Sequence, residues 1–337
     1  ETLFPYNKLM LHNSKSDLKG LWLEDFRSLL TTWDEKLFRA QQLATWIYQK
    51  GVSSFSHMTD LSKPFRKKLE ENSYVSDLKI VKTQISQDSS IKFLFELFKG
   101  ETIESVLIKE KGKNTICISA QVGCPLACTF CATGYMGFKR NLTAGEIVDQ
   151  IIQVKKFIPE NERINNLVFM GMGEPFLNYE SLLKALQIMT SDFGLGLSPK
   201  RITVSTAGVT DKIYQLAQDF PKVKLAISLH SPDEELRKKL MPLTKKYPLK
   251  PLLEAGKFYA KKTKQRITFE YVLIKEINDS NEQALKLAKL IQGIPCKINL
   301  ILYNPIADAP FERPSLERVN AFREILYPGC PAVTLRV

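Results

Sequence analysis

The feature that most constrains the fold of this chain is an alternation of short β-rich runs with helical segments, which begins near residue 115. Runs rich in β-branched and other apolar residues occupy residues 115–120, 166–170, 201–205, 223–228, 267–274 and 297–302, with a further run at 332–336. Segments with helical periodicity lie between them, at residues 143–157, 178–191, 211–219, 249–263, 280–292 and 315–326. Strands that alternate with helices are typical of a parallel sheet. We therefore expect an α/β fold built as a partial or full βα barrel, with a doubly wound open sheet as the alternative.

The residues before 115 have two other patterns. Residues 14 to about 75 read as helical, in three segments: one around Leu18, Leu21, Leu23 and Phe26, one at 37–48, and one at 55–69 that Pro64 interrupts. Two β-rich runs, 91–98 and 101–108, flank Lys99-Gly100, which is a hairpin signal. We expect a small helical accessory domain at residues 1–76, an antiparallel β extension at 77–113 and a core barrel at 114–337.

The chain is basic. It carries 48 Lys and Arg against 36 Asp and Glu, a formal charge of +12. Residues 237–266 concentrate this charge, because they hold eleven basic side chains and a single acid, Glu254. Such a stretch can neutralise several phosphates of a nucleic acid. A solvated helix face on a generally basic surface is the alternative that needs no partner.

Cysteine usage points to metal or redox chemistry. No apolar run approaches the roughly 20 residues of a membrane helix, and residues 1–6 lack the basic start and apolar stretch of a secretory signal. We therefore expect a cytoplasmic protein with no membrane partner. Three of the six cysteines fall within eight residues, and in such a compartment this clustering favours metal binding over disulfides.

The three clustered cysteines are Cys124, Cys128 and Cys131, a C-x-x-x-C-x-x-C triad just after the first predicted strand. Iron–sulfur clusters usually take four thiolates, so three in one loop leave one iron of a [4Fe-4S] cluster open to a substrate. S-adenosylmethionine (SAM) can bind there, and an electron from the cluster can then release a 5′-deoxyadenosyl radical. A structural zinc site, which prefers four ligands in paired spacing, and inert buried cysteines are the alternatives.

Candidate SAM-binding residues follow the predicted strands, where the site of a βα barrel gathers. They are Gly173 and Glu174 after the second strand, Ser205 at the end of the third, Ser228, Leu229 and His230 at the end of the fourth, and Asn304 after the sixth. Glycine allows close approach of backbone to a ligand, and a carboxylate can accept hydrogen bonds from the SAM ammonium. Each of these residues alone is more often a turn or capping residue.

With these residues in view, the chain resembles the radical SAM RNA adenine C2-methyltransferases of the RlmN type over nearly its whole length. The matching segments are 38–42, 58–61, 121–124, 171–175, 205–208, 227–230 and 296–301. The resemblance implies a radical SAM barrel, a cluster held by the triad, two SAM molecules per turnover and an RNA-binding accessory domain. It implies one adenine of large-subunit (23S) rRNA at the peptidyl-transferase centre as substrate, and an adenine 3′ of the anticodon in some tRNAs. We also expect a monomer that receives electrons from a protein such as flavodoxin.

The resemblance also assigns catalytic roles. Cys117 matches the family's resolving cysteine, which forms a disulfide with a methyl-carrying cysteine, and Glu104 matches its proposed proton acceptor. The methyl-carrying cysteine belongs to an Ala-Cys-Gly-Gln-Leu segment beyond the last predicted strand, and Cys330 precedes that strand and is not its counterpart. We therefore expect the native chain to continue past Val337. A C8-methylating relative, a radical SAM enzyme with a non-RNA substrate and a non-enzymatic metal-stapled RNA-binding module are the alternatives.

Overall fold

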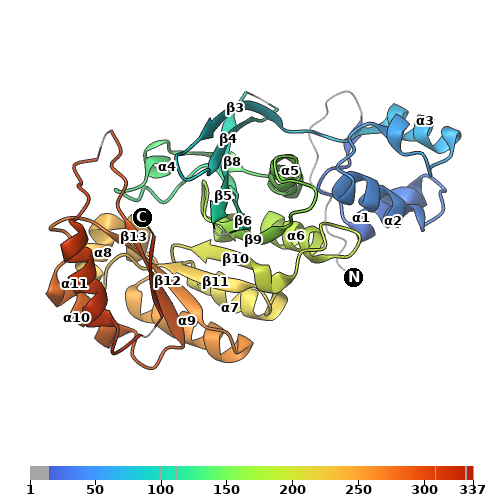
Figure 1. Cartoon of the computed structure of the whole chain (residues 1–337). Coiled ribbons are helices and arrows are strands. Elements are labelled where there is room, and N and C mark those ends of the chain that lie inside the picture. The colour runs from blue at the N-terminus through green and yellow to red at the C-terminus, as the bar shows by residue number, and fades with distance from the viewer. Residues whose placement is uncertain (1–14, 99, 111, 308, 331, 337) are drawn as a thin grey trace.

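The structure is a computed structural model, and it describes residues 15–98, 100–110, 112–307, 309–330 and 332–336. The first fourteen residues of the expected accessory domain, Lys99 of the expected hairpin turn and Val337 lie outside this range. Figure 1 shows a helical region at the N-terminal end, a long curved sheet across the middle and a group of helices toward the C-terminal end.

A ten-stranded sheet forms the centre of the molecule. Its parallel strands are β6 Lys113–Cys117, β9 Ile164–Phe169, β10 Ile202–Thr206, β11 Lys224–Ser228, β12 Ile267–Leu273, β13 Cys296–Leu302 and β14 Val333–Arg336. Each strand pairs with the next in this sequence, so the order never reverses. A doubly wound sheet requires such a reversal. The expectation of a partial βα barrel is therefore confirmed and the doubly wound alternative is wrong.

Helices connect the parallel strands and lie around the outside of the curved sheet (Figure 1). They are α5 Ala144–Lys155, α6 Tyr179–Thr190, α7 Thr210–Asp219, α8 Glu234–Leu240, α9 Leu249–Thr263, α10 Asn281–Leu290 and α11 Leu316–Leu326. Single 3-10 turns occupy Pro175–Asn178, Pro199–Arg201 and Pro242–Lys245. The sequence predicted all of these helices except α8, a short charged segment. No helix among the described residues is both long and apolar enough to span a membrane.

The antiparallel strands extend the same sheet. They are β3 Lys79–Ile85, β4 Ile91–Glu96 and β5 Thr102–Glu110, and β5 pairs antiparallel with β6. The predicted hairpin is β4 and β5. A separate two-stranded sheet joins β7 Gln121–Gly123 to β8 Phe138–Asn141, so the first predicted barrel strand ends at Cys117 and a second short strand begins four residues later.

The N-terminal region is helical, but its helices begin at other residues than the sequence indicated. It comprises α1 Leu23–Thr32, α2 Arg39–Ala44, a π-helix Thr45–Gln49, a 3-10 turn Phe55–His57 and α3 Lys63–Asn72. Leu18 and Leu21 precede α1, after the strand β1 Ser16–Asp17 that pairs with β2 Ser73–Tyr74. Pro64 lies in the first turn of α3, where a missing N–H costs nothing. Pro64 therefore starts this helix, and the prediction that it interrupts one was wrong.

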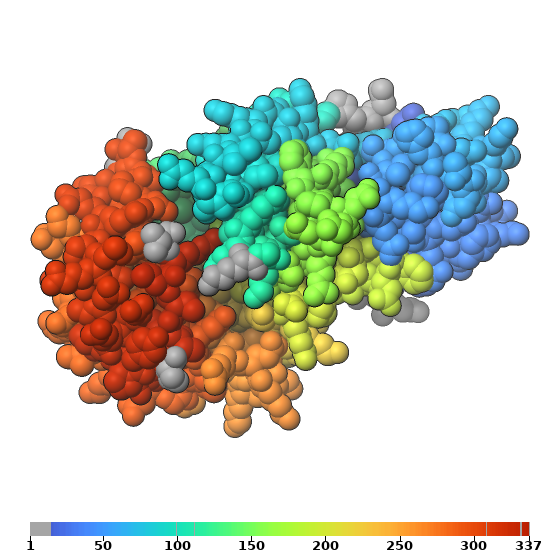
Figure 2. Space-filling view, viewed as in Figure 1, coloured from blue at the N-terminus to red at the C-terminus, as the bar shows by residue number. Residues whose placement is uncertain are grey.

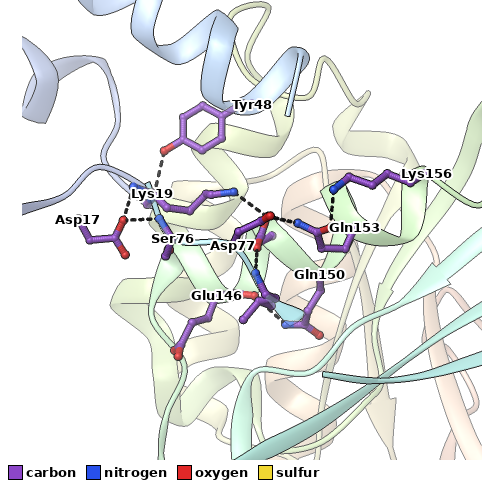
Figure 3. A network of polar contacts seen from close by, with 12 residues as sticks. Asp17, Lys19, Tyr48, Ser76, Asp77, Glu146, Gln150, Gln153 and Lys156 are labelled. Atoms are coloured by element: carbon purple, nitrogen blue, oxygen red, sulfur yellow. Dashed lines mark hydrogen bonds and ion pairs between the residues drawn. The ribbon is translucent and has the colours of Figure 1, made fainter. Parts of the chain in front are cut away.

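A buried polar joint connects this N-terminal lobe to the barrel. Figure 2 shows the lobe packed against the green and yellow segments of the core. Lys19, which is labelled in Figure 3, pairs with the carboxylate of Asp149 on α5; Nζ and Oδ1 are 2.7 Å apart, and both side chains are almost fully buried. Asp149 also accepts hydrogen bonds from the Leu78 N–H at 2.6 Å and from Gln153 at 3.2 Å. The joint, defined by Lys19, Leu78, Asp149 and Gln153, thus gives each charge a partner.

Candidate iron–sulfur and SAM site

The triad lies in a loop between β7 and α4 Ala132–Tyr135. Gly123 precedes it with φ of +73°, and a Cβ there would stand 1.8 Å from the carbonyl oxygen of Gly137, so only glycine fits this turn. The Cys124 N–H donates to that same carbonyl at 2.8 Å. Farther along, the Thr129 N–H donates to the carbonyl of Leu240, the last residue of α8, at 3.0 Å. The loop is thus held at both sides by neighbouring backbone.

The three cysteines line one cavity of about 290 Å³ beyond the carboxyl ends of the parallel strands. The candidate residues that line it with them are Gly173, Glu174, Ser205, Ser228 and His230. A larger cavity of about 770 Å³ lies between the π-helix region near Gly51 and the segment 195–201, and no cysteine lines it. The chemistry-bearing side chains therefore converge on the smaller cavity.

The donor set suits a cluster better than a single ion. All six cysteines of the chain are free. Burial raises the pKa of Cys124 to about 11 and that of Cys128 to about 12, and the neighbouring triad thiolates add to both shifts. Metal binding requires thiolates, so a cationic core would relieve this cost. Among the described residues no three ligating side chains are grouped for one ion, whereas cysteine thiolates are the usual ligands of an iron–sulfur cluster, which these three residues would hold. The site fits a cluster, and the zinc alternative fits it poorly.

Glu174 is a buried carboxylate at the cavity wall. Its two oxygens accept hydrogen bonds from the Phe176 N–H at 3.1 Å and the Ala207 N–H at 2.7 Å, and its own N–H donates to Gln121 Oε1 at 2.8 Å. Burial raises the pKa of Glu174 to about 7, although these hydrogen bonds oppose the rise. Gly173 before it has φ of +95°, and a Cβ there would collide with the Gln121 side chain. Glu174 is therefore held rigidly and is poised to ionise near neutral pH.

His230 faces the cavity as a neutral ring. Its Nδ1 accepts a hydrogen bond from the Val272 N–H at 3.0 Å, which leaves the ring proton on Nε2 as a donor. Burial, with a smaller effect from Arg237, lowers the pKa of His230 to about 3. The ring also packs edge-on against Phe130 of the triad loop at 4.8 Å between centroids. His230 thus links the fourth strand to the cysteine loop.

The remaining SAM candidates lie outside the cavity lining. Leu229 is fully buried, and its N–H donates to the Glu270 carbonyl at 3.0 Å. Asn304 is exposed, and its side-chain oxygen accepts a hydrogen bond from Arg313. The structure therefore brings together the candidates from the second to fourth predicted strands, except Leu229, and leaves the candidate from the sixth at the surface.

The two catalytic candidates lie on the paired strands β6 and β5, and neither is among the described residues that line the cavity. Cys117 is at the end of β6, in register with Val106 and Val168, and burial raises the pKa of its thiol to about 11. Glu104 on β5 is about two-fifths exposed and pairs with Lys92 Nζ at 3.0 Å. The disulfide implied for Cys117 is not supported, because all six cysteines are free thiols.

Three residues at or next to the site were not predicted from the sequence. Glu270 on β12 lines the cavity and is 5% exposed, and Asn299 donates a hydrogen bond to it at 2.7 Å. A lone carboxylate in the apolar run 267–273 was the available signal. Arg336 on β14 also lines the cavity. Arg237 was counted in the basic stretch 237–266, but it is 0% exposed. A fully buried side chain cannot bind phosphate, so that part of the surface prediction was wrong.

A three-cysteine loop at the carboxyl edge of a partial βα barrel defines the class of radical SAM proteins. The model of the Radical SAM superfamily matches residues 118–288, and the model of the ribosomal RNA large subunit methyltransferase N-terminal domain matches residues 16–75. The chain belongs to the RlmN family of this class.

Similar proteins support this assignment. A relative from Dictyoglomus thermophilum, named "Probable dual-specificity RNA methyltransferase RlmN", is 45% identical over 94% of this chain and 90% of its own length. The relative of the same name from Bacillus subtilis is 43% identical over 97% of this chain and 90% of its own length. The crystal structure of a radical SAM methyltransferase from Sphaerobacter thermophilus superposes with a TM-score of 0.91 at 40% identity and covers 95% of both chains.

Proposed function

We propose that this protein transfers a methyl group from SAM to C2 of an adenine in RNA. The observation that carries the proposal is one cavity that joins the three free cysteines to Glu174 and His230 in a chain of the RlmN family. Adenine C2 is an electron-poor carbon and cannot displace a methyl group from SAM as a nucleophile. A radical route removes this obstacle, and the site is built for one.

The proposed substrates are one adenine of 23S rRNA at the peptidyl-transferase centre and the adenine 3′ of the anticodon in tRNA. The relatives are named as dual-specificity RNA methyltransferases, and the net charge of +12 favours a polyanion. On α9, the exposed side chains of Lys250, Lys257, Lys261 and Lys262 supply part of this charge. Contact between this face and phosphates would weaken as salt rises.

Within the cavity, Cys124, Cys128 and Cys131 would hold the cluster. When bound, a four-iron cluster and SAM supply one-electron chemistry, in which the sulfonium bond breaks and a 5′-deoxyadenosyl radical forms. Gly173, Glu174, Ser205 and Ser228 would bind SAM, with the Glu174 carboxylate accepting hydrogen bonds from its ammonium group. The Nε2–H of His230 offers one donor to the same ligand. Leu229 and Asn304 remain SAM candidates, the first through its backbone.

Two further residues complete the proposal. Cys117 would resolve the bond between RNA and a methyl-carrying cysteine, and Glu104 would accept the proton from C2. The positive charge of Arg336 and a hydrogen bond with the Met170 backbone both lower the pKa of Cys117 against the effect of burial, and Arg336 and Met170 line the cavity. The Glu104 carbonyl accepts a hydrogen bond from Ser119 Oγ at 2.6 Å. The methyl-carrying cysteine matches no residue of this sequence. Two SAM molecules per turnover, one for that cysteine and one for the radical, and an electron donor such as flavodoxin belong to the same proposal.

The test uses protein reconstituted anaerobically with iron and sulfide, then supplied with SAM, a reductant and 23S rRNA or tRNA. Release of 5′-deoxyadenosine reports the radical chemistry, and mass spectrometry of RNA nucleosides from cells with and without the native protein reports the position of the methyl group. We expect 2-methyladenosine in both RNAs. Methylation at C8 would assign the chain to the C8-methylating type, and zinc-loaded protein that releases no 5′-deoxyadenosine would refute the radical route.

A further inference from the structure

Arg237 on α8 is one of the largest fully buried side chains of the protein, at 0% exposure. Its guanidinium donates four hydrogen bonds, each to a neutral acceptor. Nε donates to the Leu229 carbonyl at 3.0 Å and Nη1 to Thr244 Oγ1 at 2.8 Å, while Nη2 donates to the carbonyls of Ala207 at 2.6 Å and Ser228 at 3.0 Å. Arg237 therefore ties together the carboxyl ends of β10 and β11, which form one wall of the cavity.

This buried cation has no carboxylate partner within the part of the chain that the structure describes. Among the described residues, none of the ion pairs includes Arg237. Glu234 on the same helix acts on it only at longer range, because its oxygens face Lys238 Nζ at 3.8 Å and the Leu249 N–H at 2.8 Å. A buried charge without a counter-charge is costly, and burial lowers the pKa of Arg237 to about 10. The guanidinium still remains protonated at neutral pH.

Arg237 also interacts electrostatically with the triad. Cys128 exerts the largest electrostatic attraction on Arg237, and Arg237 in turn lowers the pKa of the Cys128 thiol against the effect of burial. The two elements are also joined directly, because Leu240 at the end of α8 accepts the hydrogen bond from Thr129. Leu126, Cys124, Cys128 and Phe130 pack in the same apolar cluster as Leu240 and Met241. The cation thus lies on the helix that contacts the cysteine loop, and it is hydrogen-bonded to the backbone of two residues that line the cavity, Ala207 and Ser228.

We propose that Arg237 is the fixed counter-charge of the cluster and raises its reduction potential, an inference that rests on the cluster of the proposed function. A four-iron core with three thiolate ligands is anionic and becomes more so when it accepts an electron. A fixed cation in a dry interior favours the more negative state, and salt screens such a buried charge only weakly. Arg237 gains or loses no proton and carries no electron, so it is a positioning residue.

The test is an EPR-monitored redox titration of the anaerobically reconstituted protein. In Arg237→Gln the positive charge is removed, and we expect the ratio of reduced to oxidised cluster at a fixed potential to fall about tenfold, which equals about 59 mV for a one-electron couple. Arg237→Lys keeps the charge and should retain most of the potential. Lys238→Gln removes a charge from the next residue, which is paired with Glu235 near the surface, and should leave the ratio unchanged.

A second pair of variants keeps Arg237 in place. Thr244→Asp puts a carboxylate against Nη1 and neutralises the guanidinium without removing it, whereas Thr244→Asn is the uncharged match. We expect Thr244→Asp to lower the ratio in the same direction as Arg237→Gln, and Thr244→Asn to leave it unchanged. The two Thr244 variants test the effect of Arg237 on the reduction potential even if Arg237→Gln fails to fold.

Two outcomes would overturn the inference. One is a potential in Thr244→Asp equal to that in Thr244→Asn, in protein that loads a cluster and releases 5′-deoxyadenosine. The other is a shift in Lys238→Gln as large as that in Arg237→Gln, which would indicate a general effect of net charge. Wild-type protein that binds no cluster would refute the proposed function itself, so the two failures are distinguishable.

Discussion

Two buried cations of this protein have opposite surroundings. At the joint between the N-terminal lobe and the barrel, Lys19 meets Asp149 at 2.7 Å. At the cavity, Arg237 donates only to three carbonyls and a hydroxyl. Both side chains are buried, but among the described residues only Lys19 is paired with a negative charge.

The difference separates a region that the chain completes by itself from one that, on the proposed function, a cluster and SAM would complete. The joint needs nothing further, because Asp149 neutralises Lys19 and is itself hydrogen-bonded by Leu78 and Gln153. The cavity is lined by three thiols, of which two have raised pKa values, and by a carboxyl group whose pKa burial raises to about 7, while the cation Arg237 is hydrogen-bonded to the backbone of its wall. Such groups are costly to bury alone and become favourable when an anionic cluster and a cationic ligand bind.

The largest expected effect comes from removing a cluster ligand. Cys128→Ala should abolish the visible absorbance of the cluster and reduce 5′-deoxyadenosine release by roughly ten-thousandfold or more, equivalent to about 5 kcal/mol in the barrier. Cys330→Ala is the matched control, because Cys330 is buried and lies away from the cavity. Equal cluster content in Cys128→Ala and wild type would show that the triad is not the ligand set.

At the joint, a substitution should change the free energy of unfolding. Lys19→Met leaves the buried Asp149 carboxylate without its cation, and loss of one partner of such a pair costs about 3–5 kcal/mol. Urea denaturation would measure the change in the free energy of unfolding. The double variant Lys19→Met/Asp149→Asn should recover part of this loss, because no unpaired charge remains. A Lys19→Met protein as stable as wild type would remove the contrast between the two regions.

A third prediction concerns pH. Because burial raises the pKa of Glu174 to about 7, the carboxyl group is mostly ionised at pH 8 and mostly neutral at pH 6. Its contact with the SAM ammonium requires the ionised form, so the Kd of the cluster-loaded protein for SAM should rise about tenfold between pH 8 and pH 6, tenfold per pH unit below the pKa. Equilibrium dialysis at the two pH values would measure this change in Kd. Glu174→Gln should bind SAM weakly, with a Kd that does not change between pH 6 and pH 8. His230 is neutral throughout this range and should add no pH dependence to the Kd.

The smallest effect is expected at a solvent-exposed pair. Glu104 and Lys92 are 3.0 Å apart and each is more than two-fifths exposed, so either Glu104→Gln or Lys92→Met should change the free energy of unfolding by less than about 1 kcal/mol. Only Glu104→Gln should also slow RNA methylation, because only Glu104 is proposed to accept a proton. Equal methylation rates for the two variants would remove Glu104 from the mechanism.

Much of the barrel could be predicted from the sequence because its strands are short apolar runs with helices between them. Local periodicity was less informative in the N-terminal region, where Leu18 and Leu21 pack as loop residues and Pro64 begins a helix. The helix α8 was missed because its seven residues are mostly charged. The helix is held against the barrel by Arg237, whose guanidinium donates hydrogen bonds to the carbonyls of Ala207, Ser228 and Leu229.

The sequence by itself determined the parallel architecture, the cysteine triad and the strand ends at Glu174, Ser205, Ser228 and His230, because periodicity and spacing are local properties of a chain. Only the tertiary structure decided that Arg237 is buried with no carboxylate partner among the residues described, that Glu270 faces the cavity, and that Lys19 is paired with Asp149, 130 residues away. The physical reason is that burial and electrostatic pairing depend on which distant segments meet, and a residue's charge alone does not reveal the partner it will find.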